Sequence, residues 1–349
     1  MVSNNNPQTG ELVTVTGASG FIAMHCILKL LQLGYRVRGT LRTPSRGEAI
    51  RRALSTHVDP GDRLEFVTVD LTSDDGWADA MAGATYLLHV ASPLPRKPPK
   101  HESELIDPAR DGALRALKAA TAAGVKSVVM TSSVAAVVYG HDRTSQRVFD
   151  ENDWSELGSE VGAYEKSKTI AERAAWDYVD KLPVEKRFAF AVVNPGLVLG
   201  PVLDSDYGTS GEVVRKLMKR ELPGCPDVSW AMVDVRDVAD AHIAAMTNPD
   251  ANGKRFIVAN AQASMVDVAQ ILNDNFASRG YKVPLRPLPN WLVRVAAIFD
   301  KTTRLALQEL GHRRLVSNAR AEQVLAWKPR TLEEMVVSMG ESLIEHGVV

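Results

Sequence analysis

The sequence predicts an α/β fold in which a doubly wound parallel sheet carries a smaller C-terminal lobe. From Leu12 to Pro195, short apolar runs alternate with amphipathic stretches, a pattern typical of parallel strands that helices cover on both faces. Right-handed crossovers then make the sheet doubly wound. The predicted strands are 12–16, 35–41, 64–69, 86–90, 127–131 and 188–193, and the predicted helices are 21–33, 45–56, 74–81, 105–123 and 163–182.

The pattern changes after Pro195, where glycine and proline become frequent. This change indicates a smaller lobe that lies over the strand ends, with one later strand returning to the sheet. A short strand and further helices are expected at 233–246, 264–276 and 331–345. The last helix begins with Thr331 and Glu334, which fit a capping box.

Composition excludes several classes of function. Lysine plus arginine number 41 and aspartate plus glutamate 42, for a net charge of -1, which argues against nucleic acid as the main partner. No apolar stretch approaches the roughly 18 residues of a membrane span, and the polar N-terminus does not resemble a signal peptide. We therefore expect a cytoplasmic protein. Cys26 and Cys225 form no zinc motif, so no metal site is expected.

The first predicted strand runs into a glycine-rich turn. Residues 13–23 read VTVTGASGFIA, so the strand ends at Gly17 and a helix begins near Gly20. Glycine permits a tight turn and lets backbone N–H groups approach a pyrophosphate, to which the helix N-terminus adds partial positive charge. An ordinary strand-to-helix turn is the alternative. The candidate dinucleotide contacts are Gly17, Ser19, Gly20, Phe21 and Ile22.

The end of the second strand indicates which dinucleotide is bound. NAD-binding versions of the turn place an acidic residue there, whereas this chain has Leu41 followed by Arg42. Six arginines and a single acid, Glu48, lie in this strand and the helix that follows. Because a guanidinium presents paired donors to a phosphate, we expect Arg42 to bind the 2′-phosphate of NADP. A solvated helix face is the alternative explanation of Arg51 and Arg52.

A tyrosine and a lysine share one face of the helix predicted at 163–182. Of the seven tyrosines, only Tyr164 has a lysine four residues on, Lys168, and residues at this spacing lie side by side on a helix. The fifth strand ends upstream in Ser132 and Ser133. Ligands bind at the carboxyl ends of strands in such sheets, so these residues are candidates for one site.

Several motifs together resemble a known family. They are TGASGFIA, LLHVASP, VVMTSSVAAVVYG, YEKSK, NPGLVLGP and, later in the chain, MVDVRDVADAHIAAM. The chain resembles the extended short-chain dehydrogenase/reductases, and within them the group of dihydroflavonol reductases, cinnamoyl-CoA reductases and carbonyl (aldehyde) reductases. The resemblance spans residues 12–345, and its specific motifs lie in 13–201 and 232–246.

The resemblance implies a catalytic triad of Ser133, Tyr164 and Lys168. A carbonyl that accepts a hydride becomes an alkoxide and needs a proton, which Tyr164 would supply. A free tyrosine has a pKa of about 10, and the Lys168 ammonium would lower it toward neutral pH. Ser133 would hold the carbonyl oxygen toward Tyr164. Ser132 is the alternate serine, although hydrogen bonding to the backbone at the strand end also explains it.

Further cofactor contacts are expected at the ends of other strands. Asp70 is a candidate partner of the adenine amino group, or else a simple turn residue. The segment after the fourth strand would approach the ribose and phosphates, and the family packs the segment after the sixth strand against the nicotinamide. The candidates are Asp70, Leu71, Val90, Ala91, Ser92, Tyr164, Lys168, Pro195, Gly196, Leu197 and Val198.

The substrate side is less specific in the sequence. Five apolar or aromatic residues are candidates either for substrate contact or for ordinary packing: Leu94, Val134, Leu203, Tyr207 and Trp230. His89, within a strand, is expected to be a core residue and not a metal ligand. The expected domains are an NADP-binding Rossmann domain of 1–195, to which 228–260 returns, and a substrate-binding lobe of 196–227 and 261–349.

The expected function is NADPH-dependent reduction of a ketone or aldehyde to an alcohol. The expected partner is a small carbonyl compound, hydrophobic or aryl-bearing, and the expected state is a monomer or a homodimer. Alternatives on the same scaffold are a nucleotide-sugar epimerase or dehydratase, a hydroxysteroid-type dehydrogenase and a non-enzymatic NADP-binding protein. Leu41 and Arg42 argue against the NAD-dependent alternatives, and the presence of Tyr164 and Lys168 argues against a non-enzymatic protein.

Overall fold

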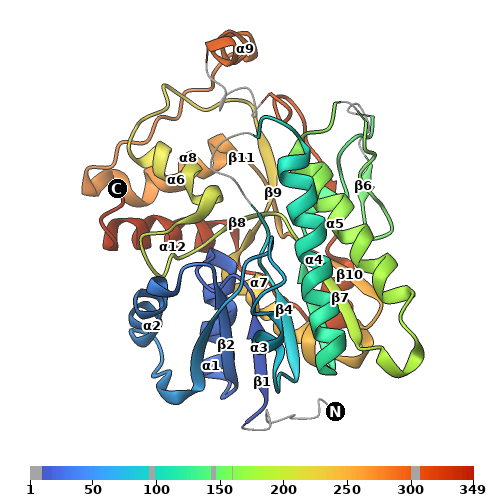
Figure 1. The fold of residues 1–349 in the computed structure, drawn as a ribbon. Coiled ribbons are helices and arrows are strands. Elements are labelled where there is room, and N and C mark those ends of the chain that lie inside the picture. The colour runs from blue at the N-terminus through green and yellow to red at the C-terminus, as the bar shows by residue number, and fades with distance from the viewer. Residues whose placement is uncertain (1–9, 94–98, 143–146, 159, 300–306) are drawn as a thin grey trace.

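A computed structural model describes residues 10–93, 99–142, 147–158, 160–299 and 307–349. Within this part of the chain, seven strands form one sheet in the order β10-β7-β5-β4-β1-β2-β3 (Figure 1). Every pairing in it is parallel, as predicted. The strands are β1 (Leu12–Val15), β2 (Arg36–Leu41), β3 (Leu64–Thr68), β4 (Tyr86–His89), β5 (Ser127–Thr131), β7 (Ala189–Pro195) and β10 (Lys254–Val258).

Helices cover both faces of this sheet. They are α1 (Phe21–Gln32), α2 (Gly47–Ser55), α3 (Trp77–Met81), α4 (Ser103–Ala123), α5 (Ala163–Asp180) and α7 (Val235–Thr247). Buried side chains of α1, α2 and α7 pack together in one apolar core, and those of α3, α4 and α5 pack in a second. Figure 1 shows α4 and α5 lying side by side against the sheet. This is the doubly wound Rossmann arrangement expected from the sequence.

The strand order reverses at β1. From β1 the chain moves outward through β2 and β3, and it then returns to place β4 on the other side of β1. In open α/β sheets the ligand lies at the carboxyl ends of the two strands that flank such a reversal. The topology therefore predicts that a ligand binds at the segments that follow β1 and β4, which begin at Thr16 and Val90.

The C-terminal lobe has its own sheet and core. Its strands β8 (Leu197–Leu199), β9 (Ser229–Asp234) and β11 (Ala261–Ser264) form a small sheet, and β6 (Val148–Phe149) pairs with β12 (Leu315–Val316). Around a separate apolar core lie α6 (Gly208–Met218), α8 (Met265–Phe276) and α12 (Leu332–Glu345). The capping box of Thr331 and Glu334 is confirmed at the start of α12.

Some boundaries differ from the expected ones. In the segment 228–260, β10 joins the central sheet beside β7, whereas β9 pairs with β8 and β11 in the smaller sheet. The helix expected from residue 74 begins at Trp77, because Gly76 before it has a left-handed φ of +79°. The helix expected from residue 45 starts with the short 3₁₀ turn Pro44–Arg46.

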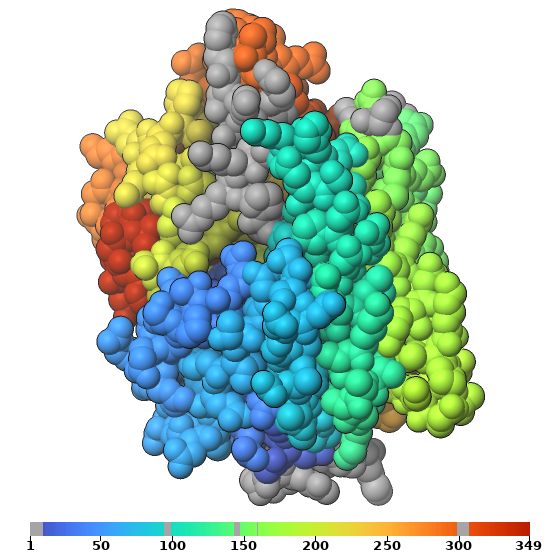
Figure 2. All heavy atoms as spheres, viewed as in Figure 1, coloured from blue at the N-terminus to red at the C-terminus, as the bar shows by residue number. Residues whose placement is uncertain are grey.

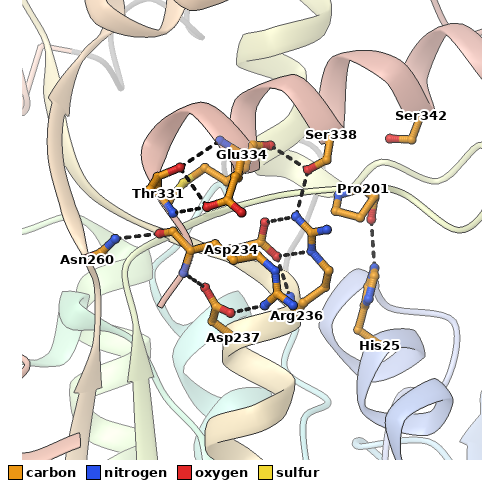
Figure 3. Close-up of polar contacts among 12 residues, drawn as sticks. His25, Pro201, Asp234, Arg236, Asp237, Asn260, Thr331, Glu334, Ser338 and Ser342 are labelled. Atoms are coloured by element: carbon orange, nitrogen blue, oxygen red, sulfur yellow. Dashed lines mark hydrogen bonds and ion pairs between the residues drawn. The ribbon is translucent and has the colours of Figure 1, made fainter. Parts of the chain in front are cut away.

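A polar network joins the two halves of the molecule (Figure 3). Asp234 caps the start of α7 and accepts hydrogen bonds from Arg236, whose guanidinium also donates to Ser338 on α12 at 3.0 Å. From α1, His25 Nε2 lies 2.8 Å from the carbonyl oxygen of Pro201. These contacts fix the lobe above the carboxyl ends of the central strands, where the site is built.

The helix α9 (Asn290–Phe299) carries exposed apolar side chains, among which Trp291 and Ile298 are each 66% exposed. Figure 2 shows it at the outer edge of the C-terminal lobe. An exposed apolar helix face was not expected from the sequence. The helix α11 (Ala319–Leu325) instead packs beside α7 and β10 against the central sheet. Among the described residues, no helix is long and apolar enough to cross a membrane.

Candidate active site

The turn after β1 is held too tightly for a side chain at Gly17. Gly17 has a left-handed φ of +70°, and a Cβ built on it would lie 3.0 Å from Ala91 Cβ. The Gly20 N–H donates to the Gly17 carbonyl at 2.8 Å, and Gly20 is the residue directly before α1. Glycine is therefore required here by backbone conformation and by space, as the turn prediction implied.

Thr16 links the two strand ends that flank the reversal. Its hydroxyl accepts a hydrogen bond from the Ala91 N–H at 3.0 Å and lies 3.0 Å from Nδ1 of His89. Burial lowers the pKa of His89 to about 4, so this imidazole is neutral at pH 7. His89 is thus a buried core residue, as expected. The role of Thr16 had no signal in the sequence, because its partners are far along the chain.

Arg42 lies where the second strand ends, and its side chain is exposed. Within the described ranges, no hydrogen bond or salt bridge engages its guanidinium, so it is free to bind an anion. Arg46 lies just beyond in the same turn and forms a salt bridge with Asp204 of the lobe at 3.4 Å. Arg42 and Arg46 are thus the two arginines that directly follow the carboxyl end of β2.

Other arginines of this region serve the fold. Arg38 pairs with Glu65 at 2.8 Å and donates to the carbonyl oxygens of Ala80 and Ala82. Arg51 donates to the backbone carbonyl oxygens of Gly61 and Leu64. Its guanidinium therefore holds the chain at the start of β3, and it neither lies on a solvated helix face nor is available for a phosphate. The local excess of positive charge in the sequence therefore overstates the number of arginines available for a phosphate.

Asp70 and Leu71 follow β3. The Asp70 carboxylate accepts hydrogen bonds from both the N–H and the hydroxyl of Thr72 at 2.7 Å, and these bonds lower its pKa. This is the turn geometry that the sequence left open as the alternative. The Leu71 side chain packs toward Gly112 of α4, and its carbonyl accepts from Arg115. A cofactor contact of either residue stays a prediction.

The three residues of the predicted triad converge from two elements. Ser133 follows β5, and Tyr164 and Lys168 lie one turn apart near the start of α5. The Lys168 Nζ lies 5.8 Å from the centre of the Tyr164 ring. Burial raises the pKa of the Tyr164 phenol, contrary to the lowering expected from Lys168, and the Ser133 hydroxyl, which faces the phenol, acts in the opposite direction to burial. The geometry suits a proton donor with a hydrogen-bonding partner beside it.

The Lys168 side chain is buried, and its ammonium has no hydrogen-bond partner in the described part of the chain. The residue is 8% exposed, and burial lowers its pKa to about 8, an effect that Glu172 opposes. An ammonium has three donors. In the described residues, the enclosed side-chain atom that lacks a partner is Asn194 Oδ1 and not Lys168 Nζ. The ammonium is therefore accessible to an acceptor from a ligand.

The structure distinguishes between the two serines. The Ser132 hydroxyl donates to Oε2 of Glu172 at 2.5 Å and points into the protein core. Ser133 accepts a hydrogen bond from the Ala135 N–H at 3.1 Å and faces Tyr164. The expected alternative was that the Ser132 side chain bonds to the backbone, but its hydroxyl bonds to the Glu172 carboxylate instead. The position of Ser133 supports its predicted role over that of Ser132.

The remaining candidates lie around the same edge of the sheet. Gly196 has no room for a side chain, since a Cβ there would lie 2.1 Å from the Ala231 carbonyl oxygen; packing against β9 explains this glycine without a cofactor. Seven others are half-buried, which leaves them accessible to a ligand: Ser19, Phe21, Ile22, Val90, Ala91, Ser92 and Leu197. Pro195 and Val198 are buried.

The candidate substrate contacts differ in how deeply they are buried. Leu203 is 7% exposed and belongs to the core, which favours packing. Val134, Tyr207 and Trp230 are half-buried. Leu94 lies outside the described residues. No group of three or more metal-ligating side chains occurs in the described part of the chain.

Comparisons with known proteins identify the family. The model of the NAD dependent epimerase/dehydratase family matches residues 13–259. The chain belongs to this family. It is 34% identical to a cinnamoyl-CoA reductase of Medicago truncatula, over 77% of this chain and 82% of the relative. It is also 34% identical to cinnamoyl-CoA reductase 2 of Arabidopsis thaliana, over 80% of each chain.

Solved structures agree with this assignment. Yeast methylglyoxal/isovaleraldehyde reductase Gre2, crystallised with NADPH, has a TM-score of 0.81 and 27% identity, with 97% of this chain and 100% of that chain covered. The Gre2 of Candida albicans in complex with NADPH has a TM-score of 0.79 and 27% identity, with coverage of 96% and 99%. The extended short-chain dehydrogenase/reductase resemblance, and the reductase group within it, are confirmed.

Proposed function

We propose that this protein is an NADPH-dependent carbonyl reductase that converts a ketone or an aldehyde into an alcohol. The observation that carries the proposal is the convergence of Ser133, Tyr164 and the Lys168 ammonium at the carboxyl edge of the sheet. The reductases among the relatives and the NADPH-bound neighbours support the same reaction class.

The residues present fit NADPH. The Gly17 turn packs against Ala91 and carries no side chain, so that a pyrophosphate can approach its backbone N–H groups. Arg42 offers an exposed guanidinium where NAD-binding proteins have an acid, and the Lys168 ammonium has three donors that ribose hydroxyls would accept from. When bound, the reduced nicotinamide supplies the hydride.

The chain itself supplies orientation and a proton. Ser133 would donate a hydrogen bond to the carbonyl oxygen and hold it toward Tyr164. Burial keeps the Tyr164 phenol protonated, which suits a donor in the direction of reduction. With a pKa of about 8, Lys168 is mostly an ammonium at pH 7, and its charge favours the phenolate that remains after the proton has left.

The substrate is proposed to be a small hydrophobic or aryl-bearing carbonyl compound. The names of the relatives support this class, since they mention methylglyoxal, isovaleraldehyde and cinnamoyl-CoA. We propose that 196–227 and 261–349 form the lobe that binds it, and that 1–195 together with 228–260 form the NADP-binding domain; within 228–260, α7 and β10 pack with the central sheet. A monomer or a homodimer stays the prediction for the oligomeric state.

One assay tests the proposal. Loss of NADPH absorbance is followed with a panel of aldehydes, aryl ketones and keto esters, and then again with NADH. We expect turnover with NADPH for part of the panel, and a Tyr164→Phe variant that is roughly 100-fold slower or worse but still binds NADPH. Tyr178→Phe, on the same helix but hydrogen-bonded to Thr121, is the matched control and keeps its rate. No turnover of any carbonyl by the wild-type protein would refute the function.

A further inference from the structure

A buried carboxylate lies behind the proposed triad. Glu172 is one turn beyond Lys168 and two turns beyond Tyr164 on the same face of α5, and it is fully buried. The proposed reaction uses no group at this position. A carboxylate so far from solvent is costly unless charged or polar partners surround it.

Glu172 has partners on three different strands or strand ends. Ser132, after β5, donates to Oε2 at 2.5 Å, and Asn194 of β7 donates to the same oxygen at 2.9 Å. Arg255 of β10 donates to Oε1 at 2.5 Å and to Oε2 at 3.3 Å. One side chain of α5 thus binds the end of β5, β7 and β10 at once.

Arg255 is fixed as firmly as its partner. It is 6% exposed, it donates to the carbonyl oxygens of Glu151 and Asp153, and its guanidinium lies 3.8 Å from the centre of the Trp154 ring. Replacing such an ion pair with apolar residues is often neutral or stabilising in other proteins. Stability alone is therefore a weak reason for this pair, and a positioning role is the better one.

The network reaches the proposed triad in two ways. Asn194 Nδ2 donates to the carbonyl oxygen of Ser133 at 3.1 Å as well as to Glu172, so the carboxylate and the serine backbone share one amide. The charge of Glu172 also acts on Lys168, whose pKa it raises against the effect of burial. The groups that face Lys168 are Glu172 and Tyr164 from α5 and the neutral His89 from β4.

We propose that Glu172 is a positioning residue of this site: it fixes the start of α5 against Ser133 through Ser132 and Asn194, and it places a carboxylate one helical turn from Lys168. The inference rests on the proposed reductase function. Glu172 touches neither substrate nor cofactor and acts through its neighbours, whereas Arg255 anchors the carboxylate.

The test uses Glu172→Gln, which keeps the shape and removes the charge. Without the charge Lys168 loses its proton at lower pH, so binding of NADPH without substrate, followed by protein fluorescence, should weaken at a pH about one unit lower than in the wild type. The alkaline limb of kcat should move in the same direction, with KM little changed. Glu151→Gln is the matched control: Glu151 is a buried glutamate near Arg255, bonded to the Ile257 N–H, and its variant should keep the wild-type pH profile.

A double variant separates positioning from stability, because Glu172→Gln alone removes the carboxylate partner of the buried Arg255. Glu172→Gln with Arg255→Met should recover the melting temperature of the wild type but keep the shifted pH profile. Recovery of both in the double variant, or a wild-type profile of NADPH binding in Glu172→Gln, would overturn the inference. If the wild-type protein reduces no carbonyl, the function itself fails, and this result is distinct from either outcome for Glu172.

Discussion

Gly17 and Ala91 face each other across the reversal point of the sheet, so closely that a Cβ on Gly17 would lie 3.0 Å from Ala91 Cβ. The two residues follow β1 and β4, which are 75 positions apart at the Thr16–Ala91 hydrogen bond. The contact makes the turn and the neighbouring strand end one rigid surface. Ligands in open α/β sheets bind at such a surface.

This contact predicts that Gly17→Ala weakens NADPH binding by roughly tenfold or more, because the new methyl group displaces the turn from Ala91 and strains a left-handed residue. Gly83→Ala is the matched control, since Gly83 has the same φ of +70° but no atom within 4 Å of a built Cβ. It should cost about 1 kcal/mol of stability and leave the Kd for NADPH unchanged. Equal losses of affinity in both variants would mean that steric contact with Ala91 is unimportant.

Arg42→Ala should weaken NADPH far more than NADH. A hydrogen bond to a charged group contributes about 1.5–3 kcal/mol, so we expect roughly a 10- to 100-fold rise in the Kd for NADPH and little change for NADH. Arg36→Ala is the control, because Arg36 is also exposed but begins the same strand at the opposite end. Titration of both variants with both dinucleotides decides the assignment. Parallel losses for NADPH and NADH would remove Arg42 from the 2′-phosphate.

The local pattern of apolar and polar residues was sufficient to predict most of the strands and helices of the large domain. The strand predicted at 127–131 is β5 itself, since it is a buried apolar run bounded by polar residues. The small sheet had no such signal. Its strand β11 reads AQAS, and its pairing with β9 depends on residues about 30 positions away, such as Ala263 with Trp230. Short strands whose burial depends on distant partners carry little local information.

The candidate site shows the same division. Tyr164 and Lys168 could be paired from the sequence because four residues place them on one helix face. Glu172 continues that spacing, so its place on the same helix face is also encoded in the sequence. Arg255 was beyond reach, because it lies 83 positions from Glu172 and is brought there by the return of β10 to the sheet. The sequence alone does not distinguish Arg42 from Arg38. In the structure Arg42 is exposed, whereas Arg38 is paired with Glu65.

Three buried histidines predict a loss of stability in mild acid. Burial lowers the pKa of His25, His89 and His242 from 6.5 to about 4 each. Because the unfolded chain binds these protons first, stability is unaffected above about pH 6.5 and falls between there and about pH 4, by about 2 kcal/mol per histidine at pH 5.

Urea unfolding at neutral pH and at about pH 5 measures this loss. His25→Gln should reduce the difference between the two conditions by about 2 kcal/mol, although it also loses the contact with Pro201 at both. His57→Gln is the control, because His57 is exposed. If the two variants lose stability equally between the two conditions, buried neutral histidine is not the cause.

The attachment of α12 to the rest of the molecule predicts a contrast between two arginines. Arg236 binds Asp234, whose side chain is fully buried, and donates to Ser338 on α12 (Figure 3). Arg279 binds Glu341 of the same helix, but both side chains are about half exposed, at 42% and 53%. Truncating the first leaves the buried Asp234 carboxylate with the Arg236 N–H as its hydrogen-bond partner among the described residues, whereas truncating the second leaves a solvated carboxylate.

Arg236→Ala should therefore cost about 2–4 kcal/mol of unfolding free energy, and Arg279→Ala less than about 1 kcal/mol. Because Arg236 joins α7 to the lobe and not to the proposed cofactor turn, its variant should still bind NADPH when folded, with KM for the carbonyl rising as the lobe loosens. Denaturant unfolding and steady-state kinetics of the two variants check this. Similar losses of stability would show that the burial of Asp234 does not set the strength of the junction.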